Sequence, residues 1–184
     1  GERRPGYVGQ PLPDVVVQLI DEAGAVVTDE EIPGEIRIKS PTVFREYWGN
    51  TEATISSFKD GWFCTGDIAV IEDGYYRIMG RSSVDIIKSG GYKLSALEIE
   101  NKLLAHPEIA EVAVVGVTDR TWGETVAAVV VLKGNTDMTL ASLKTWCEGE
   151  LSPYKIPKHL KAVDSLPRNA MGKVMKPSLK TLFE

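Results

Sequence analysis

The sequence predicts an α+β protein in two parts, a β-rich first part and a compact domain in which helices alternate with strands. Its 184 residues are more than one minimal hydrophobic core needs and fewer than most two-domain enzymes contain. The pattern changes near Gly80, where strand-like segments give way to alternating helices and strands. Apolar residues make up 43% and charged residues 26%, which is typical of a globular protein and excludes disorder or a disulfide scaffold.

Charge and cysteine usage limit the partners and the location. The chain has 21 Lys and Arg against 26 Asp and Glu, with no basic block, so no nucleic-acid partner is expected. No apolar run approaches the roughly 20 residues of a membrane span. Cys64, Cys147, His106 and His159 are isolated, so we expect no metal site and a reducing compartment. We therefore expect a soluble intracellular protein, cytoplasmic or, in a eukaryote, mitochondrial.

The first part, residues 1–81, is predicted to be mostly strand, with one short helix near residues 51–58. Residues 15–20 are rich in β-branched side chains, and residues 34–39 alternate apolar and polar side chains. The Asp73-Gly74 pair predicts a hairpin turn between strands at 68–71 and 75–79. The opening residues carry turn chemistry without a start signal, as expected of a chain that continues a longer one.

The second part, residues 82–184, is predicted to be a compact α+β domain. Ser95 and Glu98 form a capping box before a helix that ends at His106-Pro107. Pro177 suits the first residue of a terminal helix. Between these helices we expect strands at 111–117 and 125–132, a helix at 140–151 and a strand at 159–163.

Three glycine-containing loops combine flexibility with charge. Asp67 closes the first loop, residues 61–67, and its carboxylate could hold the two hydroxyls of a ribose or simply complete a turn. Gly90 and Gly91 lie between Lys88 and Lys93, a combination that suits either a phosphate passing close to the main chain or a tight hairpin with solvated lysines.

The third loop, residues 167–174, presents Lys173 directly after a glycine. A lysine on a loop can bring a compact positive charge to a developing anion, or it can simply aid solubility. By itself this motif is weak. Cys64 has no adjacent base, so we do not expect it to be a nucleophile.

Taken in series, these loops resemble the C-terminal third of the adenylate-forming superfamily, which includes acyl-CoA synthetases, luciferases and adenylation domains. The resemblance covers essentially the whole chain. Within the superfamily, residues 85–93 are most similar to malonyl- and methylmalonyl-CoA synthetases. The resemblance implies that residues 1–81 are the end of a larger N-terminal domain and that residues 82–184 form a mobile C-terminal domain. On this basis we expect a truncated chain that is inactive alone.

The resemblance implies a ligase that forms an acyl-adenylate from a carboxylate and Mg-ATP and then transfers the acyl group to coenzyme A. Asp67 would bind the ribose of ATP with help from Arg81, and Lys173 would bridge the carboxylate and α-phosphate oxygens. Gly90 and Gly91 would line the pantetheine passage, and Lys93 and, less strongly, Lys88 would meet nucleotide phosphates. The implied partners are the small-molecule carboxylate, ATP, Mg²⁺, coenzyme A and the rest of the N-terminal domain.

One departure concerns the hinge between the two domains. The family's hinge residue is commonly an Asp or Lys two residues after the arginine, where this chain has Ser83, and the segment before the glycines is one residue longer. By this resemblance we expect the hinge at Ser83, Val84 or Asp85, with Ser83 ranked first. Two other functions stay open: loading of a carrier-protein thiol and a non-catalytic α+β interaction domain. The residues around Lys88, Lys93 and Lys155 would distinguish the first of these, because a carrier protein lacks the nucleotide end of coenzyme A.

Overall fold

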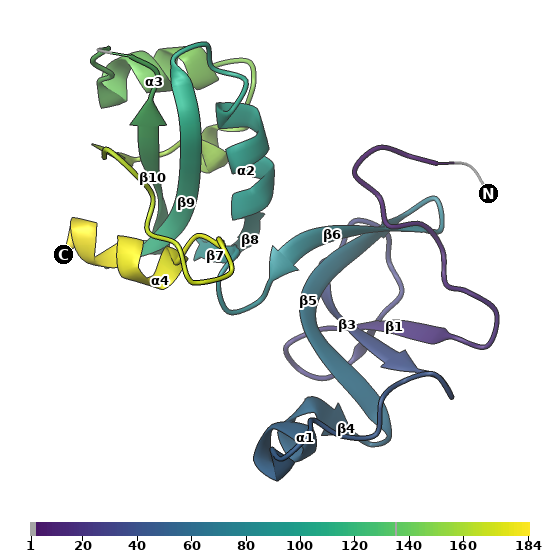
Figure 1. The fold of residues 1–184 in the computed structure, drawn as a ribbon. Helices are drawn as coiled ribbons and strands as arrows, with labels where there is room; N and C mark the ends of the chain where they lie inside the picture. The colour runs from purple at the N-terminus through teal and green to yellow at the C-terminus, as the bar shows by residue number, and fades with distance from the viewer. Residues whose placement is uncertain (1–2, 135) are drawn as a thin grey trace. The chain divides into compact units, whose positions relative to one another are not determined.

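The computed structural model describes residues 3–134 and 136–184 and divides the chain into two compact units (Figure 1). The first unit ends at Ser82 and the second begins at Ser83. Each unit contains its own sheet together with helices, which confirms the predicted α+β class. Within the described residues, no helix is both long and apolar enough to cross a membrane.

The first unit is built on an antiparallel sheet with the strand order β2-β1-β3-β5-β4, in which β6 also pairs with β5. The predicted hairpin is present between β5 and β6, and Asp73 and Gly74 both have positive φ, at 50° and 76°. Such a two-residue turn matches the twist of the flanking strands. The elements are β1 (Val16–Ile20), β2 (Val26–Val27), β3 (Gly34–Lys39), α1 (Thr51–Ser57), β4 (Phe58–Lys59), β5 (Trp62–Glu72) and β6 (Tyr75–Arg81).

The core of the first unit is small. Leu19, Ile36 and Ala69, contributed by β1, β3 and β5, form a buried cluster, and four further side chains of this unit are buried: Ile20, Ile68, Val70 and Met79. Partly buried side chains surround the cluster, among them Ile71 and Tyr76. Since hydrophobic stabilisation scales with the apolar area removed from water, this unit depends on few side chains for its stability.

The second unit has a mixed sheet with the order β11-β10-β7-β8, in which β9 also pairs with β10. Strand β11 runs parallel to β10, and the other pairs are antiparallel. The elements are β7 (Ile86–Ser89), β8 (Tyr92–Ser95), α2 (Ala96–Leu103), β9 (Ile109–Asp119), β10 (Gly123–Leu132), α3 (Leu140–Cys147), the 3₁₀ turn η1 (Pro153–Lys155), β11 (His159–Ala162), α4 (Lys176–Leu179) and the 3₁₀ turn η2 (Lys180–Phe183).

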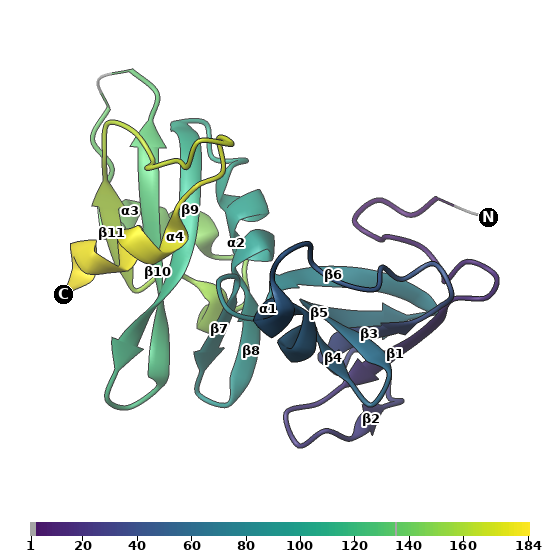
Figure 2. The ribbon, with the colours of Figure 1, turned by 60° about the horizontal axis from the view of Figure 1, so that its bottom comes forward.

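Both faces of the second sheet are covered. Neighbouring residues of one strand therefore belong to different cores, because alternate residues point to opposite faces of the sheet. Val115 and Val129 pack with Leu179 of α4, which lies over β9 and β10 (Figure 2). Val114 and Val130 belong to the core of the other face. That core also contains Ile99 and Leu103 of α2 and Leu143 of α3.

Two local predictions need correction. The predicted helix at 140–151 ends at Cys147, because Glu148 is extended and Gly149 has a φ of 88°. The terminal helix begins at Lys176, one residue before Pro177. The Ser95 hydroxyl caps α2 by accepting from the Glu98 amide at 3.1 Å, as the sequence predicted, and one oxygen of the Glu98 carboxylate forms an ion pair with Lys155 at 2.5 Å.

Candidate functional site

In the first unit, Asp67 lies on an irregular stretch of β5. The register between β3 and β5 runs from Glu35 opposite Ile68 directly to Arg37 opposite Cys64, so residues 65–67 bulge out of the ladder. Gly66 takes a φ of 73° within this bulge, a conformation that glycine adopts without strain. The Thr65 hydroxyl bonds to the Ile36 carbonyl at 2.8 Å and accepts from the Asp67 amide at 3.1 Å. These bonds hold the bulge in place.

Arg81 lies opposite Asp67 at the end of β6 and forms an ion pair with it. Arg81 Nε is 3.1 Å from Asp67 Oδ1, and Arg81 Nη1 donates to the Thr65 carbonyl at 2.5 Å. A Cβ on Gly66 would lie 3.0 Å from Arg81 Nη1, so the glycine also makes room for the guanidinium. The Asp67 and Arg81 side chains are 30% and 59% exposed, so the pair stays accessible to a hydroxylated or anionic ligand.

The segment after Arg81 passes from one unit to the other. The Ser82 amide donates to the Gly66 carbonyl at 2.9 Å, within the first unit. Ser83 is exposed and is the first residue of the second unit. Asp85 is half-buried, and its carboxylate is 2.6 Å from Lys176 Nζ within the second unit. Of the hinge candidates, Ser83 therefore lies at the boundary, whereas Asp85 is bound inside the second unit.

Gly90 and Gly91 form the two-residue turn of the β7–β8 hairpin. Their φ values are 57° and 85°, and the register pairs Lys88 with Lys93 and Ser89 with Tyr92. Positive φ at both central residues is typical of the mirror-image hairpin turns that require glycine. Both glycines are exposed. The hairpin therefore presents a bare backbone tip.

Trp122 contacts this tip, a neighbour that sequence reasoning did not find. The Gly90 amide donates to the Trp122 carbonyl at 2.9 Å, and a Cβ on Gly90 would lie 2.8 Å from the indole ring. A Cβ on Gly91 would meet no atom within 4 Å. Gly90 is thus required by packing against Trp122, and Gly91 leaves open space. Lys158 Nζ lies 4.7 Å from the centroid of the indole and places a cation on the ring.

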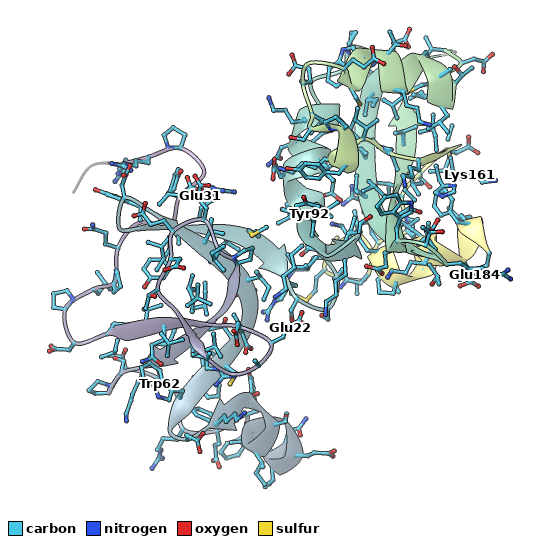
Figure 3. The ribbon with its side chains drawn as sticks, turned by 180° about the vertical axis from the view of Figure 1, so that it is seen from behind. Glu22, Glu31, Trp62, Tyr92, Lys161 and Glu184 are labelled. Carbon is cyan, nitrogen blue, oxygen red and sulfur yellow. The ribbon has the colours of Figure 1, made fainter. Side chains whose placement is uncertain are left out.

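Aromatic and charged side chains continue from the hairpin along the same unit. Tyr92, labelled in Figure 3, stacks on Tyr154 with a centroid separation of 4.9 Å. Lys155, next to Tyr154, is paired with Glu98. Both tyrosines are about half exposed, so their rings offer an apolar surface beside the glycine turn.

Lys173 is exposed and lies on a loop that is held by hydrogen bonds of its own. The Asn169 side-chain oxygen accepts from the Met171 and Lys173 amides, both at 3.0 Å, and the Asn169 amide donates to the Lys173 carbonyl at 2.9 Å. Arg168 donates to the Gly172 carbonyl at 2.8 Å and forms an ion pair with Glu111 of β9. The loop is therefore ordered, and the Lys173 residue is accessible to solvent.

The Lys173 loop and the glycine turn lie at opposite ends of β9. The first is tied to Glu111, near the start of the strand; the second contacts Trp122, whose amide donates to Asp119 at the strand's end. Positions 111 and 119 differ by 8 residues, which at about 3.3 Å per residue corresponds to roughly 26 Å. Figure 2 shows the β7–β8 turn at one end of the sheet and the segment between β11 and α4 toward the other.

The two thiols are unsuited to nucleophilic chemistry. Burial raises the pKa of the Cys147 thiol to about 11, and burial also raises the pKa of Cys64. At neutral pH both groups are protonated, and the thiol is a weaker nucleophile than the thiolate. Within residues 3–134 and 136–184, no three His, Cys, Asp or Glu side chains gather in a way that could hold a metal ion.

Residues 98–173 match the family model described as the AMP-binding enzyme C-terminal domain. The matched segment includes most of α2, the β9–β10 pair and the loop up to Lys173.

Relatives and solved structures extend the match over the whole chain. The mitochondrial malonate–CoA ligase ACSF3 of Mus musculus is 50% identical over 196 residues, covering 96% of this chain and 34% of the relative. A malonate–CoA ligase of Arabidopsis thaliana is 47% identical over 196 residues, covering 100% of this chain and 32% of the relative. The crystal structure of ATP-bound MatB from Rhodopseudomonas palustris superposes with a TM-score of 0.83 at 39% identity, covering 100% of this chain and 37% of that one.

These comparisons confirm the resemblance to the C-terminal portion of adenylate-forming enzymes and, among them, to malonate–CoA ligases. The chain spans about a third of the length of the curated relatives that it matches.

Proposed function

We propose that this chain is the C-terminal portion of an ATP-dependent acid–thiol ligase that first forms an acyl-adenylate and then an acyl-CoA thioester. The observation that supports this most directly is the separation of the Lys173 loop and the glycine turn along β9. Two loops that contact β9 at points roughly 26 Å apart along the strand do not reach one reacting centre together. A domain that presents them in turn has one face for each half-reaction.

In the first half-reaction, Asp67 and Arg81 hold the nucleotide and Lys173 stabilises the charge. The partly exposed Asp67 carboxylate accepts hydrogen bonds from the ribose hydroxyls, and Arg81 orients it. The Lys173 ammonium lies between the substrate carboxylate and the α-phosphate, two anions whose repulsion opposes attack. Mg²⁺ enters as part of the substrate Mg-ATP, and no residue of this chain is assigned to it.

In the second half-reaction the domain turns about Ser83, which withdraws Lys173 and brings the glycine turn to the adenylate. The pantetheine arm passes over Gly91, where no side chain obstructs it. Lys93 and Lys88, one on each strand of the hairpin, supply positive charge for the nucleotide phosphates of coenzyme A. The thiolate attacks the acyl carbon of the mixed anhydride, the acyl–oxygen bond breaks, and AMP leaves.

Malonate is the proposed acid, because relatives that match nearly the whole chain are named malonate–CoA ligases. One of these relatives is named as mitochondrial, so we place the enzyme in the mitochondrion or, in an organism without one, in the cytoplasm.

The test compares Lys173→Ala with Lys161→Ala, an exposed lysine on β11, in the enzyme that carries this chain. We expect Lys173→Ala to slow malonyl-adenylate formation by about 10²- to 10³-fold, since one stabilising donor is worth that much in a transition state. Thioester formation from supplied malonyl-adenylate should be largely retained. Both rates should be near normal in Lys161→Ala.

Three outcomes would contradict the proposal. Equal loss of both half-reactions in Lys173→Ala would remove its assigned role. Acyl transfer to a carrier-protein thiol with none to coenzyme A would favour an adenylation domain. Adenylate formation with neither malonate nor any other short carboxylate would favour a non-catalytic interaction domain.

A further inference from the structure

The second unit contains a buried charge cluster that the half-reactions above do not use. Lys176 Nζ lies 2.6 Å from Asp85 Oδ1 and 2.7 Å from Glu100 Oε1. The three side chains are 9%, 14% and 13% exposed, respectively. Glu100 Oε1 also accepts a hydrogen bond from the Val114 amide at 2.7 Å. One ammonium therefore joins two carboxylates away from water.

This cluster connects segments that are far apart in the sequence. Asp85 precedes β7 and lies two residues after Ser83, where the second unit begins. Glu100 belongs to α2, and its Val114 partner belongs to β9. Lys176 opens α4 directly after the Lys173 loop, whose base is closed by the Met175 amide donating to the Pro167 carbonyl at 2.8 Å. Lys176 thus fixes the point at which this loop rejoins the packed domain.

The chemistry of the cluster favours a directional role. Two carboxylates and one ammonium carry a net charge of −1, and desolvating such a group costs more than burying apolar side chains of similar volume. If this position only filled the core, a leucine or methionine would stabilise the domain more than a lysine does. A lysine that reaches two fixed carboxylates has one geometry, and that geometry sets the direction of the chain leaving the loop.

We propose that Lys176 is a positioning residue that, through Asp85 and Glu100, holds the Lys173 loop in the orientation needed for adenylate formation. This inference rests on the proposed function. Lys176 touches no substrate: it acts through the chain segment between positions 173 and 176. Asp85 is then the fixed end of the moving domain, which leaves the pivot to the residues before it.

The kinetic test uses Lys176→Met, which keeps the length of the side chain and removes its charge, and Lys176→Arg, which keeps the charge. Lys180→Met is the matched control, because Lys180 lies four residues further on and pairs with Glu124 in a more exposed setting. Since a displacement of about 1 Å can cost 10²-fold, we expect Lys176→Met to lower kcat for adenylate formation about tenfold to a hundredfold. KM for ATP and the thioester step should change little. Lys176→Arg should recover most of the rate, and Lys180→Met should resemble wild type.

Equal loss of both half-reactions in Lys176→Met would overturn the proposal, because that is the result of partial unfolding. Wild-type kinetics would overturn it as well. If Lys176→Met does not fold, Asp85→Asn is used instead, because it removes the Lys176–Asp85 ion pair and leaves the Lys176–Glu100 pair. The same selective loss in Asp85→Asn, at smaller size, would support the proposal, and unchanged half-reactions would overturn it.

Amide hydrogen exchange separates this inference from the proposed function, because it needs no activity. We expect residues 167–175 of Lys176→Met to exchange faster than in wild type while β10 keeps its protection. Wild-type protection of the loop in the variant would overturn the anchoring role, even if wild-type protein forms the adenylate normally. Faster exchange of the loop in an enzyme that forms no adenylate would refute the proposed function and leave the anchoring role standing.

Discussion

The two units each contain a carboxylate paired with a cation, and the two clusters differ in their contact with water. In the first unit, Asp67 and Arg81 meet at the surface, where the arginine is 59% exposed. In the second unit, Lys176 meets Asp85 and Glu100 at exposures of 14% or less. Water screens the first cluster, so its stability contribution is small and a ligand can reach its polar atoms. The second cluster is desolvated, so its three side chains bind one another and a ligand does not reach their polar atoms.

The largest expected effect is on the free energy of unfolding. Its absence would contradict the contrast between the exposed pair and the buried cluster. Lys176→Met leaves two buried carboxylates without a cation, and we expect the free energy of unfolding to fall by about 3–5 kcal/mol. Arg81→Met removes the cation of the exposed pair and should cost about 0–1 kcal/mol. Urea denaturation followed by tryptophan fluorescence measures both. Similar losses of unfolding free energy in the two variants would show that burial does not make the Lys176 cluster more important for stability than the Asp67–Arg81 pair.

The next effect concerns the ligand and has the opposite ranking. Asp67→Asn removes the charge that strengthens hydrogen bonds to ribose hydroxyls, which are worth about 1.5–3 kcal/mol each when one partner is ionised. We expect ATP to bind the enzyme about tenfold to a hundredfold more weakly, by calorimetric titration. Glu100→Gln is the control and should bind ATP like wild type. Unchanged ATP affinity in Asp67→Asn would make the exposed pair a purely structural turn.

The smallest effect is the pH dependence of the buried cluster. Burial raises the pKa of Glu100 above 4.5, Asp85 adds to the rise, and the Lys176 ammonium and the Val114 amide oppose it. The folded state therefore binds this proton more tightly than the unfolded state. The resulting stability is present in full below pH 4.5 and is lost as the pH rises through the raised pKa.

The measurement for Glu100 is the free energy of unfolding of wild type and Glu100→Gln across pH 4 to 7. The free energy of unfolding of wild type minus that of Glu100→Gln should fall as the pH rises, by about 1.4 kcal/mol in total for each unit by which the pKa is raised. Asp67→Asn, from the exposed cluster, serves as the comparison. A difference for Glu100→Gln that grows with pH would mean that its pKa is lowered by its partners instead.

Elements with local signals were predicted well. The β5–β6 hairpin follows from Asp73-Gly74, and α2 follows from the Ser95 cap. The end of α3 was wrong by four residues, because Trp146 and Leu151 continue an apolar pattern that Gly149 interrupts. One oxygen of the Glu98 carboxylate also pairs with Lys155, 57 residues away in sequence, a partner that the local spacing did not predict.

By itself, the sequence determined the turns, the caps, the apolar strands β9 and β10, and the motifs that resemble the C-terminal portion of adenylate-forming enzymes. These features depend on residues within a few positions of each other, where backbone sterics and local hydrogen bonds decide. Only the tertiary structure decided that Trp122 packs on Gly90, that Lys173 and the glycine turn lie at opposite ends of β9, and that Lys176 meets Asp85, 91 positions earlier. The attraction between two opposite charges increases when they are buried, and burial exists only once distant segments have packed together.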